Sequence, residues 1–374
     1  MEKIRLEECC DILDSMRVPI TAKDRKKGPY PYYGANGVQD YVADYIFDDE
    51  LVLLAEDGGN FGSEVKPIAY KISGKCWVNN HAHVLKPKEG IDVDYLCYSL
   101  MFYKVDGMVN GATRKKLTQA AMREMLIPLR RIEKQKEIVG ILNKVQTLIQ
   151  KEREQIELYD KLVKARFVEM FGDPIINEKR WKRVVMGDIC EIGSSKRIFE
   201  KEYVASGVPF YRTKEIVELS RGCEISTELY ITRERFEELK EKYGVPVEND
   251  LLISAVGTIG IIWVVDGKQD FYFKDGNLIK IDASTAFDSL YMKYLLEKLI
   301  ENYKNKMSTG TAYSALTISG LKEMVAYDVP ISLQKRFAAF AQQVERLKST
   351  TKKSLAKLQT LQKSLMQQYF IQPK

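Results

Sequence analysis

The chain has 374 residues, enough for two or three domains, and its hydrophobic content of 45% allows sizeable cores. The net charge of +6 comes from 58 basic and 52 acidic residues, a mild excess that permits nucleic-acid binding without requiring it. No apolar run reaches the roughly 18 residues of a membrane-spanning helix, and no signal peptide begins the chain. The six cysteines form no CxxC pair, which argues against a disulfide or zinc framework. We therefore expect a soluble, cytoplasmic protein.

The first part of the chain, residues 1–130, is rich in Tyr, Val, Ile and Gly in short runs. This pattern is typical of a mixed α+β domain. A helix is predicted over residues 94–103. Strands are predicted over residues 18–21, 50–55, 69–72, 76–79 and 83–86.

A long helix is predicted from Gln135 to Phe171. Apolar residues recur at helical spacing there, one line of them every seven residues, and charged residues fill the other faces. At 1.5 Å per residue the helix would be roughly 55 Å long. The sequence Gly172-Asp173-Pro174 is a typical helix end.

The second part, residues 177–330, repeats the mixed pattern. Strands are predicted over residues 250–255, 260–265 and 278–281, and a helix over residues 289–303. A second long helix is predicted from about Leu333 to Phe370, with an apolar stripe and a lysine-rich face.

An internal repeat organises the whole chain, because residues 117–171 align without a gap with residues 316–370. We predict an α+β protein with two mixed α/β domains in tandem, at residues 1–130 and 177–330. Each is followed by a long helix, at residues 131–176 and 331–374. The narrow apolar stripes favour pairing of the two helices as an antiparallel coiled coil with pseudo-two-fold symmetry. The alternative is that each helix folds back on its own domain.

The apolar stripes supply the residues expected at the helix–helix interface. On the first helix they are Leu142, Val145, Ile149, Ile156, Tyr159 and Val163, and on the second Val344, Leu347, Leu358, Leu361 and Leu365.

Motifs for catalysis are not found. There is no phosphate-binding G-x-x-x-x-G-K-[ST] sequence and no Asp-Pro-Pro-aromatic or Asn-Pro-Pro-aromatic motif to hold a base. The two histidines, His81 and His83, would point to one face of a strand, but no third metal ligand lies near them in sequence. We expect a protein that binds a target, with no metal, no cofactor and no catalytic residues of its own.

Three stretches of the first domain carry a resemblance to a known family. They are PYYGANGVQDY at residues 31–41, YIFDDELV at 45–52 and WVNNHAHVL at 77–85. Each resembles a target recognition domain of the specificity (S) subunits of type I restriction–modification systems. IPL at 127–129 and VPI at 329–331 resemble the entry to that family's helices, and DLLIS at 250–254 resembles the frame of its second domain.

The resemblance implies a division of labour. Each recognition domain would read one half of a split DNA target, and the paired helices would set the spacer. The helices would also dock methyltransferase (M) subunits, two of them, and the complex would include restriction (R) subunits. S-adenosylmethionine, ATP and Mg²⁺ would belong to those partners, which methylate adenine or translocate and cut DNA.

Candidate DNA-binding residues are loop residues with short polar groups or long cationic side chains. In the first domain they are Tyr32, Tyr33, Gly34, Asn36, Gly37, Asn60, Asn80, Asn110, Gly111, Thr113, Arg114, Lys115 and Lys116. In the second domain they are Lys182, Arg183, Arg212, Thr213, Lys214, Thr258, Gly310, Thr311 and Tyr313. The tyrosines could instead pack in the core, and the charged residues could be ordinary solvated surface.

Two other functions remain open from the residues alone. The chain could be an enzyme with DNA-recognition modules, although the missing cofactor motifs count against it. It could also be a scaffold whose coiled coil is the functional part and whose domains bind protein.

Overall fold

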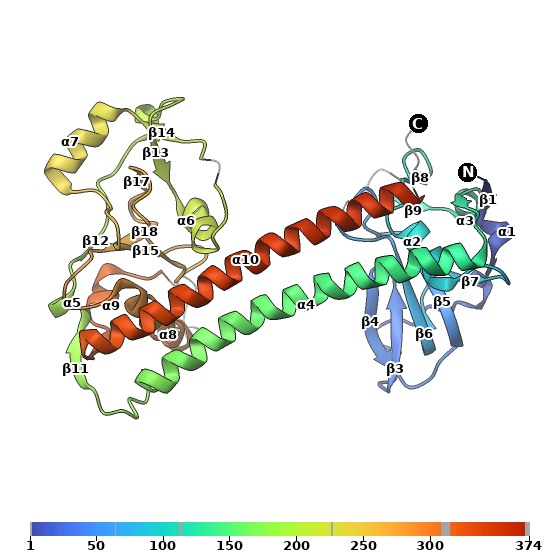
Figure 1. The fold of residues 1–374 in the computed structure, drawn as a ribbon, viewed down its shortest axis with the longest axis horizontal. Coiled ribbons are helices and arrows are strands. Elements are labelled where there is room, and N and C mark those ends of the chain that lie inside the picture. The colour runs from blue at the N-terminus through green and yellow to red at the C-terminus, as the bar shows by residue number, and fades with distance from the viewer. Residues whose placement is uncertain (1, 64, 112–113, 226, 308–314, 371–374) are drawn as a thin grey trace. The chain divides into compact units, whose positions relative to one another are not determined.

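The computed structural model describes residues 2–63, 65–111, 114–225, 227–307 and 315–370. The chain divides into two compact units, Met1–Glu152 with Ser354–Lys374, and Arg153–Lys353. The boundary falls within both long helices, α4 (Ile132–Phe171) and α10 (Ile331–Phe370) (Figure 1). Each unit therefore contains one mixed domain, the first part of the helix that follows it, and the last part of the other helix. No helix in the described ranges is long and apolar enough to cross a membrane.

The first unit is built on a six-stranded sheet in the order β2-β7-β5-β6-β3-β4, in which only β3 and β6 are parallel neighbours. Helix α2 (Val93–Met101) covers one face and packs Leu96 and Leu100 against Val52 and Leu54. The strands are β2 (Cys10–Ile12), β3 (Tyr30–Gly34), β4 (Gly37–Val42), β5 (Phe47–Ala55), β6 (Ala69–Val78) and β7 (Ala82–Pro87).

Two details of this sheet differ from the sequence prediction. The predicted strands at 69–72 and 76–79 are one strand, β6, because Gly74 continues the pairing with β5 while adopting a φ of 75°. Residues 18–21 form no strand. Side chains satisfy their backbone instead, since Trp77 donates to the Val18 carbonyl and the Tyr32 hydroxyl accepts from the Ile20 amide.

Short elements complete the first unit. Strand β1 (Lys3–Arg5) pairs with β10 (Leu126–Pro128) just before α4 begins. The others are α1 (Leu6–Cys9), η1 (Asp14–Met16), β8 (Val109–Asn110), β9 (Lys116–Leu117) and α3 (Gln119–Arg123).

The second unit repeats this plan with a split sheet. A four-stranded sheet has the order β12-β18-β15-β16, and a three-stranded sheet has the order β14-β13-β17. Their strands are β12 (Ile192–Gly193), β13 (Val208–Tyr211), β14 (Tyr230–Ile231), β15 (Leu251–Ser254), β16 (Ile262–Val264), β17 (Tyr272–Phe273) and β18 (Leu278–Ile281).

The remaining elements of the second unit mirror or extend those of the first. Strands β11 (Lys182–Val185) and β19 (Val325–Asp328) pair just before α10, as β1 and β10 do before α4. The helices are α5 (Met186–Ile189), η2 (Glu200–Glu202), α6 (Thr213–Ser220), α7 (Arg233–Tyr243), α8 (Ser289–Met307) and α9 (Ile318–Lys322). The sequence analysis did not predict α6 or α7.

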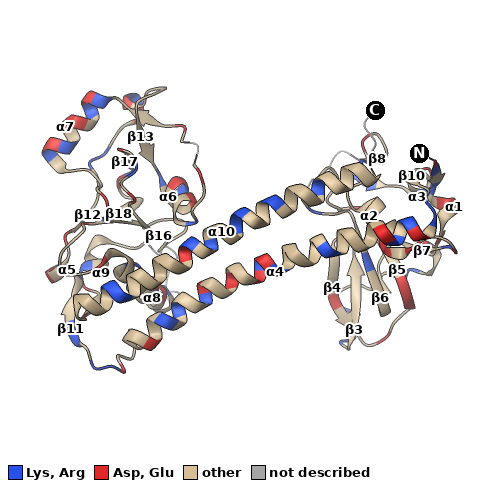
Figure 2. Cartoon of the chain, viewed as in Figure 1, with Lys and Arg blue, Asp and Glu red and all other residues tan. Residues whose placement is uncertain are grey.

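Helices α4 and α10 pack together and run antiparallel, as predicted. Their cross-helix contacts advance along α4 from Gln146 to Glu152 while the partners descend along α10 from Gln362 to Ser354. Charged residues of both signs lie along both helices (Figure 2). The pairing and the tandem α+β plan predicted from the repeat are confirmed.

The predicted interface stripe contains two errors. Leu347 and Leu361 are 48% and 46% exposed. The neighbouring positions Lys348 and Gln362 face the other helix instead, where they bond Asp160 and Gln146. The other predicted residues are buried (Leu142, Val145, Ile149, Val163, Val344) or half-buried (Ile156, Tyr159, Leu358, Leu365).

A buried glutamine fastens each long helix to its own domain. The Gln135 side chain accepts from the Asp92 amide at 2.9 Å and donates to the Gly90 and Arg130 carbonyls. Gln334 repeats this on the second domain, where it accepts from the Asp288 amide at 2.8 Å. Because these backbone groups begin α2 and α8, the angle between each helix pair is set by hydrogen bonds as well as by apolar packing.

An aromatic pair fastens the end of each long helix to the other domain. Phe370 at the end of α10 lies 5.2 Å from Tyr95, between ring centroids, and Phe171 at the end of α4 lies 4.8 Å from Tyr291. The two pairs occupy matching positions of the repeat. Each unit is thus built from the same three parts: a domain, the start of the long helix that follows it, and the end of the other long helix. This repetition agrees with the predicted pseudo-symmetry.

Candidate nucleic-acid interface

Three loops of the first domain meet at one end of its sheet. Strand β6 is bent so that residues near both of its ends lie beside the end of β3. The Tyr70 hydroxyl donates to the Gly34 carbonyl, and the Asn79 amide donates to the Tyr33 carbonyl at 3.0 Å. The β3–β4 turn, the loop after β5 and the β6–β7 turn therefore come together, although they are far apart in sequence.

Amide side chains connect these loops. Asn36 donates to the Gly58 carbonyl at 3.0 Å, Asn60 donates to the Asn36 side chain at 3.1 Å, and Asn79 donates to Gln39 at 2.9 Å. Of the predicted residues, Asn36 and Asn60 therefore lie in direct contact. We call this set, Asn36, Asn60, Asn79 and Gln39, the amide cluster. Amide groups of this kind can both donate to and accept from base edges.

Glycine is required in the turn that carries Asn36. A Cβ built on Gly34 would lie 2.2 Å from the Gln39 amide nitrogen and 3.1 Å from that of Asn79. Gly37 adopts a φ of 112°, which L side chains rarely adopt. The tight β3–β4 turn thus keeps its backbone close to the amide cluster.

The loop that joins β8 and β9 adds cationic side chains beside the amide cluster. Arg114 lies against Gly58 and forms an ion pair with Asp57 at 2.6 Å, and Lys116 forms one with Glu56 at 2.9 Å. Lys115 and Asn110 are exposed. The predicted loop therefore lies next to the predicted Asn residues, but two of its three cations are paired with carboxylates.

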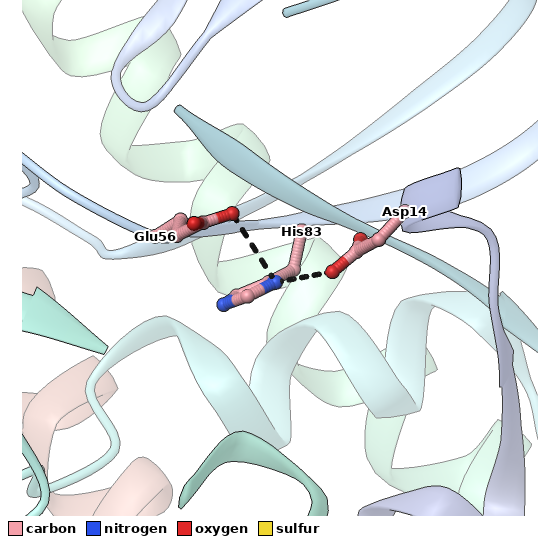
Figure 3. Close-up of side chains that lie close together, drawn as sticks. All are labelled: Asp14, Glu56 and His83. Atoms are coloured by element: carbon pink, nitrogen blue, oxygen red, sulfur yellow. Dashed lines mark hydrogen bonds and ion pairs between the residues drawn. The ribbon is translucent and has the colours of Figure 1, made fainter. Parts of the chain in front are cut away.

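One of those carboxylates, Glu56, belongs to a buried network centred on His83 (Figure 3). The His83 Nδ1 atom lies 2.6 Å from an Asp14 oxygen and 3.7 Å from a Glu56 oxygen. The Nε2 atom lies 2.9 Å from the Leu117 carbonyl oxygen. Both ring nitrogens of His83 are therefore occupied by contacts to buried oxygen atoms of the protein.

Arg17 completes this network. Its guanidinium bonds Glu56 at 2.6 Å, the Ala82 carbonyl at 2.7 Å, and Asp14 at 3.4 Å. Burial by itself would raise the pKa of Asp14, but hydrogen bonding and charge from His83 outweigh it and lower that pKa. Burial would also raise the pKa of Glu56, but hydrogen bonds from Lys116 and Arg17 outweigh burial and lower that pKa. Both carboxylates are therefore ionised.

The network does not suit a metal ion or catalysis. Asp14, Glu56 and His83 offer ligand atoms within 4.8 Å of one another. However, Arg17 and Lys116 already neutralise the carboxylates, and both His83 nitrogens are occupied by hydrogen bonds. His83 is also completely buried, so no substrate reaches it. His81, which was predicted to share its strand face, lies in the turn before β7 and pairs with Asp57.

The second domain builds the same junction without charges. The Leu117 amide donates to the Glu56 carbonyl, and the Leu316 amide donates to the Ala255 carbonyl. Ala255 therefore stands where Glu56 does, and the strand pairing places Ile279 where His83 is. Both are buried. Because the fold forms with apolar residues there, the ionic network is a property of the first domain and not a requirement of the fold.

Among the candidates in the second domain, Arg212 has a structural partner. Its guanidinium bonds the buried Glu215 at 2.8 Å, and its own amide donates to the same carboxylate. The Glu215 carboxylate thus caps the start of α6, and only about a third of the Arg212 side chain is exposed. The Thr213 hydroxyl is buried without a hydrogen-bond partner among the described residues. Lys214 and Thr258 are exposed.

The structure removes two candidates from the first domain. Tyr32 is 1% exposed, with its hydroxyl bonded to Ile20, so it is a core residue that cannot contact DNA. Gly34 is buried, and Tyr33 is half-buried against Tyr70, 6.0 Å away between ring centroids. Lys182 and Arg183 lie on β11 with exposed side chains. Thr113, Gly310, Thr311 and Tyr313 lie outside the described residues.

Comparison with known proteins identifies the family. The model described as the type I restriction modification DNA specificity domain matches residues 1–158 and again residues 178–360. A protein of Haemophilus influenzae named as a type I restriction enzyme specificity subunit is 31% identical over 94% of this chain and 89% of its own length. The MjaVIII specificity subunit of Methanocaldococcus jannaschii is 22% identical over 98% of this chain and 91% of its own.

Solved structures agree in fold. The S subunit of a type I restriction–modification system from M. genitalium superimposes with a TM-score of 0.61 at 13% identity, covering 100% of this chain and 96% of that one. A second solved structure, from work on complex assembly and conformational transition of the type I R-M system, gives a TM-score of 0.54 at 17% identity. The match covers 99% of this chain and 97% of that one. Two matched domains, a relative similar over nearly its full length and the shared fold together show that the chain belongs to the family of type I restriction–modification specificity subunits.

Proposed function

We propose that each domain of this chain reads one half of a split target in double-stranded DNA, and that α4 and α10 set the distance between the halves. The carrying observation is a duplicated scaffold with different loop chemistry. Three features recur in both units: the two-stranded pair just before the long helix, the buried glutamine, and the aromatic pair at the end of the other long helix. The His83 network has no counterpart in the second domain, where Ala255 and Ile279 occupy the positions that match Glu56 and His83.

Two copies of one frame with different loops suit two half-sites of different sequence. Hydrogen bonds to base edges in the major groove would supply the sequence preference, and lysine and arginine contacts to phosphates would supply salt-dependent affinity. The half-sites would lie on one face of the duplex, about one helical turn or a multiple of it apart.

The proposal includes partners that supply the chemistry. The exposed sides of α4 and α10 would dock two methyltransferase subunits, and restriction subunits would join that complex. S-adenosylmethionine, ATP and Mg²⁺ would act in those subunits, in the cytoplasm, while this chain contributes recognition alone. The burial of His83 supports a non-catalytic role. Both of its ring nitrogens are occupied by hydrogen bonds within the protein, and no substrate can contact the side chain.

The test is to map methyladenine by single-molecule sequencing of DNA from cells that express the chain with its methyltransferase partner. We expect a split motif, with two short half-sites around a constant gap and a methyladenine in each half. A matched variant with Asn36→Ala and Asn60→Ala should relax or abolish one half-site and leave the other unchanged. An assembled, DNA-bound complex that methylates an uninterrupted motif, or both half-sites changing together, would contradict the proposal.

A further inference from the structure

A basic segment of the first domain has, apart from Arg17, no role in the interface described above. Residues 17–28 connect η1 to β3 and contain five cationic side chains and one acidic side chain. The cations are Arg17, Lys23, Arg25, Lys26 and Lys27, and the acid is Asp24. The segment has almost no regular secondary structure, yet the structure holds it at several points.

The start of the segment is held by the His83 network and by two aromatic residues. Arg17 is fixed by Glu56 at 2.6 Å. Trp77 Nε1 then donates to the Val18 carbonyl at 2.6 Å, and the Tyr32 hydroxyl accepts from the Ile20 amide at 3.0 Å. The segment therefore leaves the amide-cluster end of the sheet along a defined path.

The end of the segment is held by Arg25 and by the backbone. The Arg25 guanidinium lies 4.3 Å from the centroid of the Tyr32 ring and bonds Asp40 at 3.3 Å. The Ala43 amide donates to the Lys26 carbonyl at 2.9 Å. A side chain on Gly28 would lie within 2.2 Å of Ala43, so glycine permits this close approach.

The cations divide into two groups. Arg17 and Arg25 have carboxylate partners and act as anchors. Lys23, Lys26 and Lys27 are exposed and form no ion pair with any described residue. The anchored backbone thus presents three exposed ammonium groups within five residues of chain, an arrangement that attracts an anionic partner.

The second domain lacks this feature. Its corresponding segment, residues 197–207, contains two cationic and two acidic side chains. Arg197 is paired with Asp275 at 2.8 Å. The connection between β12 and β13 therefore forms without a net charge, so the basic excess of residues 17–28 is not needed for folding.

We infer that Lys23, Lys26 and Lys27 form a phosphate-binding surface through which the first domain holds the DNA backbone beside its half-site. The inference rests on the proposed function. Lysine ammonium groups are compact, mobile charges that suit phosphates and carry no base information. The surface fixes the position of the duplex, and the exposed members of the amide cluster, Asn36 and Gln39, face the bases.

The test uses the complete complex of this chain with its methyltransferase subunits. Binding to a random-sequence duplex is measured over a range of salt concentrations for the wild type and for the variant Lys23→Ala, Lys26→Ala, Lys27→Ala. Each lost phosphate contact lowers the slope of log K against log salt by roughly 0.9, so the slope should fall by about two to three. Affinity should fall roughly 10- to 100-fold at about 0.1 M salt. The methylated motif should keep its sequence.

The control removes the same charge from the second domain through Lys201→Ala, Lys240→Ala and Lys242→Ala, lysines that lie among acidic residues of η2 and α7. This variant should keep the wild-type slope. An unchanged slope in the first variant, with DNA binding by the wild type intact, would overturn the inference alone. Normal DNA binding with a loss of subunit assembly would assign the surface to a protein partner instead. Failure of the wild type to bind DNA would reject the proposed function itself.

Discussion

At the scale of single residues, two cations of the first domain near the amide cluster have carboxylate partners. In the β8–β9 loop and at the start of β9, Arg114 and Lys116 are held in place by ion pairs with Asp57 and Glu56. Ordered cations lose less conformational entropy on binding than free ones. Sequence reasoning identified these cations but not their carboxylate partners, because no local pattern relates residues 56 and 57 to residues 114–116.

The first prediction concerns this loop. Replacing Arg114, Lys115 and Lys116 together with alanine should weaken DNA binding and lower the salt slope by about one to three. The loss follows from removing three positive charges and uncovering two carboxylates near the DNA. Binding isotherms at several salt concentrations measure it. A slope equal to that of the wild type would show that the loop does not contact phosphates.

The second prediction concerns the His83 network. His83→Ile alone should lower the free energy of unfolding by about 3–5 kcal/mol, because it leaves Asp14 and Glu56 buried with less compensation. The combined variant Asp14→Ser, Arg17→Met, Glu56→Ala, His83→Ile removes the charged partners together, with Ala and Ile as in the second domain, and should lose less than half as much. Urea denaturation at neutral pH compares them. A combined variant less stable than the single one would refute the internal comparison.

The same network gives the protein a defined acid sensitivity. The pKa values of Asp14 and Glu56 are lowered from ordinary values of 3.8 and 4.5. Their contribution to stability is therefore complete above about pH 4.5 and is lost as pH falls through the lowered folded-state values. Between about pH 6 and pH 3, the melting temperature of the wild type should fall more steeply with decreasing pH than that of the combined variant. Parallel curves would contradict the assignment.

At the scale of elements, the long helices are the best-predicted part of the fold. Their heptad stripe is a local pattern, and the ends of both helices were predicted within a few residues. Helix α7 was missed because it is largely charged and buries little beyond Phe236 and Leu239. A signal was present at its start, since the Thr232 hydroxyl accepts from the Arg235 amide as an N-cap.

The third prediction concerns the junction between domain and helix. Gln135→Ala should lower the free energy of unfolding of the first unit by about 1–3 kcal/mol, because it removes three hydrogen bonds from part-buried backbone groups. The matched control is Gln155→Ala on the exposed side of α4, which should change stability by less than about 0.5 kcal/mol. Chemical denaturation of the full chain measures both. Equal effects of the two substitutions would exclude the proposed role of the buried glutamine.

At the scale of the whole molecule, the repeat is what relates the two recognition domains. Deleting seven residues from each long helix, residues 150–156 and 351–357, preserves the heptad stripe and shortens each helix by roughly 10 Å. The preferred gap between half-sites should shrink by about three base pairs, at about 3.4 Å per pair, while the half-site sequences stay the same. Methyladenine mapping reads this out. A methylated motif with the original gap would show that the helices do not set the spacer.

The sequence by itself determined the tandem plan, the two long helices and their pairing, since these depend on a duplicated local pattern and on a heptad period. It also identified loops with suitable chemistry, among them Asn36, Asn60 and Arg114. The tertiary structure decided which of these side chains meet. Tyr32 lies in the core and Leu347 on the surface, because the path of residues 17–28 and the placement of Lys348 depend on contacts between distant residues. The ionic network of Asp14, Glu56 and His83 could not be predicted, because its members belong to three separate segments that only the folded sheet brings within 4.8 Å of one another.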